Sequence, residues 1–185
     1  MRKTIVRVLW LLVLVGLDGR AGIPEVSRWV LVDTQGQTLS VMEGEAIKKI
    51  YRDISIGRFG ASDRRVRGDA KTPIGQYRIT EVHPKSQFHR FLALDFPNIE
   101  DAERAFRDGR ISATDRDRIL AAKLHGREPP ADTPLGGHIG IHGIGSGNAS
   151  VHGRFNWTQG CVALRDTQLN ELMNWVGVGT AVVIR

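Results

Sequence analysis

The segment NWTQGCVALRD, Asn156 to Asp166, contains Cys161, the single cysteine of this 185-residue chain. Gly160 stands directly before it and permits a tight turn at that point. One cysteine cannot form a disulfide within its own chain, so the thiol is inert, bonded to another molecule, or reactive. The sequence on both sides of the segment is needed to choose between these roles.

The residues around this segment have the patterns of strands and a helix. Before it, Ile139 to Ile144 is a short apolar run typical of a buried strand. After it, Asp166 is a good N-cap for a helix over Thr167 to Val176, in which apolar residues share one face. Ala181 to Ile184 is predicted to be a last buried strand.

The N-terminal half carries the alternation of apolar and polar residues that is typical of β-strands. The Gly- and Arg-rich stretch Gly57 to Gly68 is predicted to be a loop. Turns separate the predicted strands, which indicates a β-meander. These strands are Trp29 to Val32, Gln37 to Met42, Ala46 to Ile56 and Gln76 to Val82.

The spacing of apolar residues becomes helical in the middle of the chain. Helices are predicted over Ile99 to Arg107 and Asp115 to His125, with Thr114 as the N-cap of the second. We interpret residues 99–126 as a helical insertion, either a lid or wall over a binding cleft or a cap on one end of the sheet. The sequence shows no repeat and no linker, so residues 27–185 are predicted to form one α+β domain that is mainly β.

Residues 1–21 are predicted to be a secretory signal peptide. A basic start is followed by an apolar run from Val8 to Leu17 and by the small residues Gly19 and Ala21. The run is shorter than the about 20 apolar residues that a membrane-spanning helix needs. The alternatives are an uncleaved N-terminal anchor or a buried first strand. Export to the periplasm or cell envelope favours a reactive role for Cys161, because an idle thiol is easily oxidised there.

The chain is basic, with a formal net charge of +6 and a pI near 10.0. Arginines gather between Arg58 and Arg67, which suits contact with a polyanionic surface such as cell wall or anionic lipid. A solvated face without a partner is the alternative. No nucleic-acid-binding motif is recognised, so nucleic acid is not expected as a partner.

A cysteine nucleophile needs a base for the thiol proton and donors for the developing oxyanion. His142 lies near the end of the predicted strand, and an imidazole can take a thiol proton near neutral pH. A tight turn can aim the backbone N–H groups of Gly160 and Cys161 at one point, and Thr158 can add a hydroxyl donor. The sequence therefore contains candidates for each of these parts.

A zinc site is the alternative use of the cysteine. His138, His142, His152 and Cys161 offer three imidazoles and a thiolate. His138 and His142 are four residues apart in a stretch predicted to be extended, where that spacing separates them by about 13 Å. They are then too far apart to share one ion, so no metal is expected.

In its motifs the chain resembles the YkuD-type L,D-transpeptidase catalytic domain. The family pattern is a His-Gly pair, a spacer, and Ser/Thr-x-Gly-Cys followed by an aliphatic residue. The resemblance covers Trp29 to Arg185, nearly all of the predicted mature chain. The matching stretches are His142-Gly143, Thr158-Gln159-Gly160-Cys161-Val162, Gly68 to Tyr77 (GDAKTPIGQY), Leu92 to Asn98 (LALDFPN) and Leu135 to Gly143 (LGGHIGIHG).

The resemblance implies a β-sandwich-like α+β domain and a cysteine acyltransferase that needs no metal or organic cofactor. Cys161 is expected to attack a peptidoglycan stem peptide at the L-centre of its third residue, a diamino acid. His142 is expected to move the proton, with the carbonyl of Gly143 orienting the imidazole. The alternatives are an L,D-carboxypeptidase or hydrolase that releases D-Ala or a wall-attached protein, and a non-catalytic wall-binding module.

One position departs from the pattern. Many members have arginine after the aliphatic residue, where this chain has Ala163. Trp157-Thr158 together with Ala163 resembles a branch that includes enzymes suspected of hydrolysis or of acting on wall-attached protein. Arg165, two residues further on, is a candidate substitute for the missing arginine. The departure affects the expected acceptor and outcome rather than the acylation step.

Overall fold

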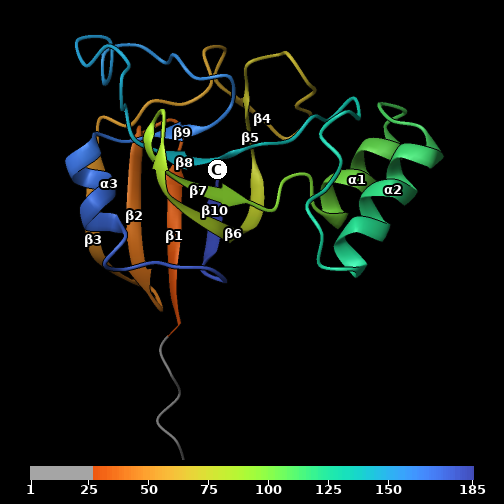
Figure 1. The fold of residues 1–185 in the computed structure, drawn as a ribbon, viewed down its shortest axis with the longest axis horizontal. Coiled ribbons are helices and arrows are strands. Elements are labelled where there is room, and N and C mark those ends of the chain that lie inside the picture. The colour runs from red at the N-terminus through yellow and green to blue at the C-terminus, as the bar shows by residue number, and fades with distance from the viewer. Residues whose placement is uncertain (1–26) are drawn as a thin grey trace, which may run out of the picture.

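The computed structural model describes residues 27–185, so the predicted signal peptide lies outside the described residues. The described part has an eight-stranded sheet, a second sheet of two short strands, and three helices (Figure 1). In chain order the elements are β1 (Arg28–Asp33), β2 (Thr38–Glu43), β3 (Ala46–Arg52), β4 (Ala61–Ser62), β5 (Thr72–Pro73), β6 (Gly75–Ser86), β7 (His89–Leu94), α1 (Ile99–Arg107), α2 (Ala113–Leu124), β8 (Gly140–His142), β9 (Val162–Ala163), α3 (Asp166–Leu172) and β10 (Ala181–Ile184).

The large sheet has the strand order β3-β2-β1-β10-β6-β7-β8-β9 and curls over on itself. Strand β6 makes the turn: its first residues pair with β10 and the residues from Ile79 onward pair with β7. At the far ends, Ser55 after β3 forms a bridge with Ala163 of β9. The fold is therefore the expected β-sandwich-like, mainly β arrangement with helices added at its sides.

The core lies inside this curled sheet. Strand β1 buries every second residue, Val30 and Val32, as the alternating sequence predicts. Strand β10 pairs in parallel with β1 and contributes Val182 and Ile184 to the same core. Helix α3 is held on the sheet by Leu169 and Leu172, which are fully buried. Burial of this apolar surface is the main force that holds the sheet closed.

The helical insertion lies at the side of the molecule opposite to α3 (Figure 1). Both helices begin with a capping box, at Asn98 with Asp101 for α1 and at Ser112 with Asp115 for α2. The prediction that Thr114 caps the second helix is wrong by two residues. Ser112 takes the position because its hydroxyl oxygen accepts the N–H of Asp115. Among residues 27–185 no helix has the length and apolar character needed to cross a membrane.

The C-terminal helix differs from its prediction at both ends. Its N-cap is Arg165 rather than Asp166, because the Gln168 side chain accepts the N–H of Arg165 and the Asp166 carboxylate is used elsewhere. The helix ends at Leu172, earlier than the predicted Val176, and Met173 is its C-cap. The short helix still covers the sheet as the apolar periodicity predicts.

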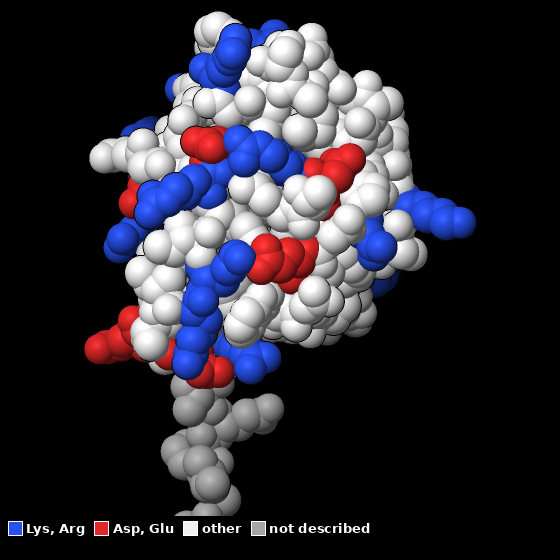
Figure 2. All heavy atoms as spheres, turned by 90° about the vertical axis from the view of Figure 1, so that its left-hand side faces the viewer, with Lys and Arg blue, Asp and Glu red and all other residues white. Residues whose placement is uncertain are grey.

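Surface charge is mixed on the side of the molecule that carries β3 and α3. Figure 2 shows acidic side chains between the lysines and arginines of this face. Several of them form ion pairs, such as Lys49 with Glu171 and Arg165 with Asp53. Arg65, a member of the predicted basic cluster, is buried. It therefore belongs neither to a surface that contacts a polyanion nor to a solvated face.

Candidate active site

Cys161 lies just before the start of β9, and His142 lies at the end of β8, the parallel strand beside it. Strands β8 and β9 pair with Ile141 opposite Val162 and His142 opposite Ala163. Paired residues of a parallel ladder have side chains on the same face, so this register places the thiol two residues before the imidazole along one face.

The turn before Cys161 requires a glycine. Gly160 has a φ of +130°, a conformation that residues with a side chain rarely adopt. A Cβ atom at this position would also lie 2.8 Å from the carbonyl oxygen of Lys71. The glycine of the Thr-x-Gly-Cys motif is therefore required by the backbone conformation of the turn and by its close packing on Lys71.

Thr158 holds the same turn together. Its hydroxyl donates to the carbonyl oxygen of Cys161 at 2.7 Å and accepts the N–H of Gly160 at 3.1 Å. The hydroxyl and the Gly160 N–H are therefore used within the turn, where they are not aimed at a substrate. The Cys161 N–H is the third predicted oxyanion donor, and neither of these two bonds involves it.

The Cys161 thiol is protonated at neutral pH. The residue is partly accessible, and its Sγ donates to the carbonyl oxygen of His138 over 3.5 Å. Burial of the sulfur raises the thiol pKa to about 11, against the opposing effects of the Gly140 N–H and the positive charge of Arg65. The site therefore holds a thiol that needs a base when it reacts.

His142 is the candidate for that base. Its side chain is buried and lies against Phe88, with ring centroids 4.4 Å apart, and against the edge of Trp157 at 5.7 Å. Nδ1 donates to the carbonyl oxygen of Gly143 at 2.6 Å, which fixes the tautomer and leaves the lone pair on Nε2. Burial lowers the imidazole pKa below its usual value, so His142 is neutral near pH 7.

Asp166 fixes the loop that follows His142. One carboxylate oxygen accepts the N–H of Ile144 at 2.7 Å and that of Gly145 at 3.0 Å. A side chain at Gly143 would collide with this carboxylate, so the loop needs glycine there. Sequence reasoning assigned Asp166 to the cap of α3, and no local pattern indicated this bond to a loop more than twenty residues away.

Ala163 and Arg165 each have other partners in the structure. Ala163 is fully buried, and its N–H donates to the carbonyl oxygen of Ser55 at 2.7 Å. Arg165 is exposed and pairs with Asp53 at 2.9 Å. The guanidinium whose charge acts on the thiol belongs instead to Arg65, which the sequence analysis placed in a surface cluster.

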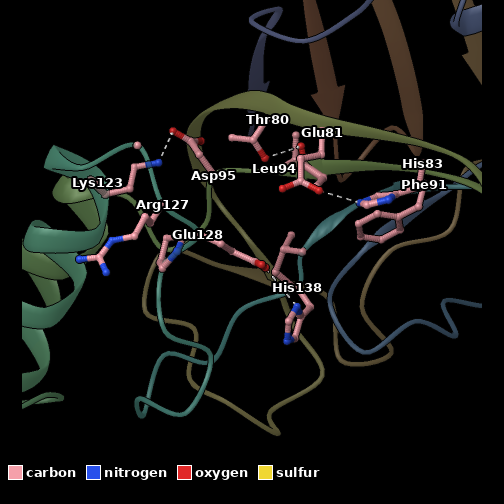
Figure 3. A pocket seen from close by; sticks show the side chains of 14 residues that line it. Thr80, Glu81, His83, Phe91, Leu94, Asp95, Lys123, Arg127, Glu128 and His138 are labelled. Atoms are coloured by element: carbon pink, nitrogen blue, oxygen red, sulfur yellow. Dashed lines mark hydrogen bonds and ion pairs between the residues drawn. The ribbon is translucent and has the colours of Figure 1, made fainter.

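A cavity of about 440 Å³ lies between β6, β7 and the chain that follows α2 (Figure 3). One of its lining residues is His138, whose carbonyl oxygen accepts from the Cys161 thiol. Among the charged side chains that line it, Lys123 pairs with Asp95 at 3.2 Å and His138 pairs with Glu128 at 3.3 Å. Because Lys123 belongs to α2, the insertion forms one wall of this cavity.

The four residues of the alternative zinc site are not gathered into one. Within residues 27–185, no group of three or more histidine, cysteine or acidic side chains is close enough to hold a metal ion. His138 pairs with Glu128, and His152 contacts Ser55 and Trp157.

The family comparison matches nearly all of the described chain. The family model of the L,D-transpeptidase catalytic domain, YkuD, covers residues 27–184. No curated protein gives a significant match to the chain.

Solved structures share the fold at low sequence identity. The helical cell shape determining protein Pgp2 from Campylobacter jejuni has a TM-score of 0.57 and 21% identity, over 89% of this chain and 52% of that chain. Bd1075 from Bdellovibrio bacteriovorus has a TM-score of 0.54 and 24% identity, over 85% of this chain and 47% of that chain. A mutant of the Enterococcus faecium L,D-transpeptidase has a TM-score of 0.50 and 11% identity, over 86% of this chain and 50% of that chain. The chain thus spans about half the length of these structures.

Proposed function

This chain belongs to the YkuD family of L,D-transpeptidase catalytic domains, and we propose that it is a cysteine-dependent L,D-transpeptidase acting on peptidoglycan stem peptides. The observation that supports this most is the arrangement of Cys161 just before β9 and His142 at the end of the paired strand β8, with Nε2 of His142 left to accept a proton. The proposal includes no metal and no organic cofactor. It places the enzyme outside the cytoplasm, in the periplasm or cell envelope, where its substrate is.

Acylation begins when the Cys161 sulfur attacks the carbonyl carbon at the L-centre of the third-position diamino acid. Nε2 of His142 takes the thiol proton, and the electron pair of the carbonyl moves to its oxygen, toward the Cys161 N–H. When the tetrahedral intermediate collapses, the bond to the D-amino acid nitrogen breaks. The imidazolium protonates that nitrogen, which leaves a thioester on Cys161 and a free D-amino acid.

The electrostatics of the site suit this order of events. A thiol with a raised pKa and an imidazole with a lowered pKa are both neutral near pH 7. The proton then moves during the attack rather than before it. The bond from Nδ1 to the Gly143 carbonyl favours the imidazolium when it forms, because a carbonyl oxygen accepts more strongly from a charged donor.

The second half of the reaction decides the product. An amine that attacks the thioester gives a crosslink, or an attachment to a wall-associated protein, and returns the proton through His142. Water in place of the amine gives hydrolysis and a tripeptide. The cavity that His138 lines is large enough to hold part of a peptide, and the carbonyl oxygen of His138 accepts from the Cys161 thiol.

The test is product analysis of purified muropeptides, with and without an added amine acceptor. We expect the amine to appear in the product and the yield of tripeptide to fall in its presence. Cys161→Ala is the matched inactive variant, because it removes only the sulfur. If tripeptide is the sole product at every acceptor concentration, the protein is an L,D-carboxypeptidase and the transpeptidase assignment is wrong.

A further inference from the structure

Arg65 is a buried charge beside the nucleophile turn. Its side chain is 6% exposed, although arginine is almost never buried without a partner. Nε donates to the carbonyl oxygen of Lys71 at 3.1 Å, and Nη1 donates to that of Leu135 at 3.1 Å. Carbonyl oxygens are neutral, so these two bonds engage Nε and Nη1 without cancelling the positive charge.

The nearest carboxylate compensates this charge only in part. An oxygen of Asp69 lies 3.7 Å from Nε of Arg65, beyond hydrogen-bond distance. The Asp69 oxygens accept the N–H groups of Val66 and Lys71 instead. The ring of Phe96 lies 5.1 Å from the guanidinium carbon and contributes an apolar surface. The positive charge of the guanidinium therefore still acts on other groups around it.

Those neighbours are the two segments that flank the sulfur. A Cβ atom at Gly160 would lie 3.5 Å from Nε of Arg65, so the guanidinium packs against the residue before Cys161. Arg65 also binds the carbonyl oxygen of Leu135, three residues before His138. The carbonyl oxygen of His138 in turn accepts a hydrogen bond from the Cys161 thiol. Arg65 therefore joins the chain on both sides of Sγ.

We propose that Arg65 is a positioning residue that stabilises the Cys161 thiolate with its charge while holding the two flanking segments. This rests on the proposed role of Cys161 as nucleophile. It also explains how the site works with alanine at position 163 and with Arg165 paired to Asp53. A positive charge close to a thiol favours its anion, and Arg65 acts on Cys161 in that direction.

Alkylation of the thiol by iodoacetamide, followed from neutral to alkaline pH, tests this without any substrate. Cys161 is the single cysteine, so the reaction reports on one atom. We expect Arg65→Met to react about threefold to tenfold more slowly below the thiol pKa, since part of the loss is offset by the greater nucleophilicity of a more basic thiolate. Arg65→Lys keeps the charge and is expected to restore most of the rate. Arg64→Met, at an exposed neighbour, is the control and should react like the wild type.

Asp69→Asn gives a second test that does not depend on the folding of Arg65→Met. It removes the negative charge that opposes Arg65, so the pH profile should shift to lower pH, with a slightly lower plateau rate because a less basic thiolate is less nucleophilic. A loosened structure would instead raise the rate at every pH, plateau included. An unchanged profile in folded Asp69→Asn and Arg65→Met would overturn the proposal. Loss of the proposed enzyme activity alone would leave these alkylation results intact, so the two failures are distinguishable.

Discussion

Burial shifts the pKa values of Cys161 and His142 in opposite directions, and both shifts favour the neutral form of the side chain. It raises the thiol pKa of Cys161 to about 11 and lowers the imidazole pKa of His142. Both changes disfavour the charged forms, because a charge is less stable away from water. The resting pair is therefore thiol and neutral imidazole, which suits the proposed role of His142 as a general base rather than as a permanent imidazolium.

This pair predicts the pH dependence of acylation. His142 loses its proton at a pH below its usual 6.5, so the base stays available in mildly acidic solution. We expect the rate of acylation by a carbapenem to be constant around neutral pH and to fall only well below pH 6.5. Rapid-mixing kinetics across this range measure it. A rate that already falls between pH 8 and 7 would show that His142 titrates too high for this assignment.

At the scale of secondary structure, the site depends on contacts between the ends of elements. Helix α3 begins at Asp166, whose carboxylate binds the two N–H groups after His142-Gly143. The end of β8 and the start of α3 are thereby fixed to each other. This bond holds the Gly143 carbonyl where Nδ1 of His142 needs it.

Asp166→Ala is expected to lower both acylation rate and stability. The substitution leaves two backbone N–H groups without their acceptor, which costs about 1 to 3 kcal/mol for each group that water cannot reach. We expect a lower Tm and a loss of acylation of about tenfold or more, with Asp166→Asn intermediate because it keeps one acceptor oxygen. Asp117→Ala, at an exposed residue of α2, is the control. Equal acylation in Asp166→Ala and the wild type would remove Asp166 from the account.

On the scale of the whole molecule, local patterns predicted most of the elements and the motif predicted the pair Cys161 and His142. The spacing of apolar residues predicted the three helices and the strands β1, β2, β3, β6, β8 and β10, but it did not predict β7 or the short strands β4, β5 and β9. The burial of Arg65 and the bond from Asp166 to Ile144 were not predictable in this way. Both depend on loops that are distant in sequence and meet only after the sheet has curled, so a local rule such as N-cap preference gave the wrong partner for Asp166.

The stability of the domain is expected to fall on mild acidification. Burial lowers the pKa of both His142 and His152, so below about pH 6.5 the unfolded chain binds protons that the folded chain does not. The stabilisation is complete above that pH and is lost as pH falls toward the folded-state values. Urea unfolding should give a free energy on the order of 1 kcal/mol lower at pH 5.5 than at pH 7.5. His152→Gln should reduce the difference, and a free energy that rises toward pH 5.5 would contradict the prediction.

Intact-mass measurement after exposure to a carbapenem tests the central claim most directly, namely that Cys161 is a nucleophile activated by His142. We expect one covalent adduct on the wild-type protein, none on Cys161→Ala, and much slower formation on His142→Ala. The folded state of each variant is checked by circular dichroism. Absence of an adduct on folded wild-type protein, or an adduct that persists in Cys161→Ala, would contradict the account and favour a non-catalytic wall-binding module.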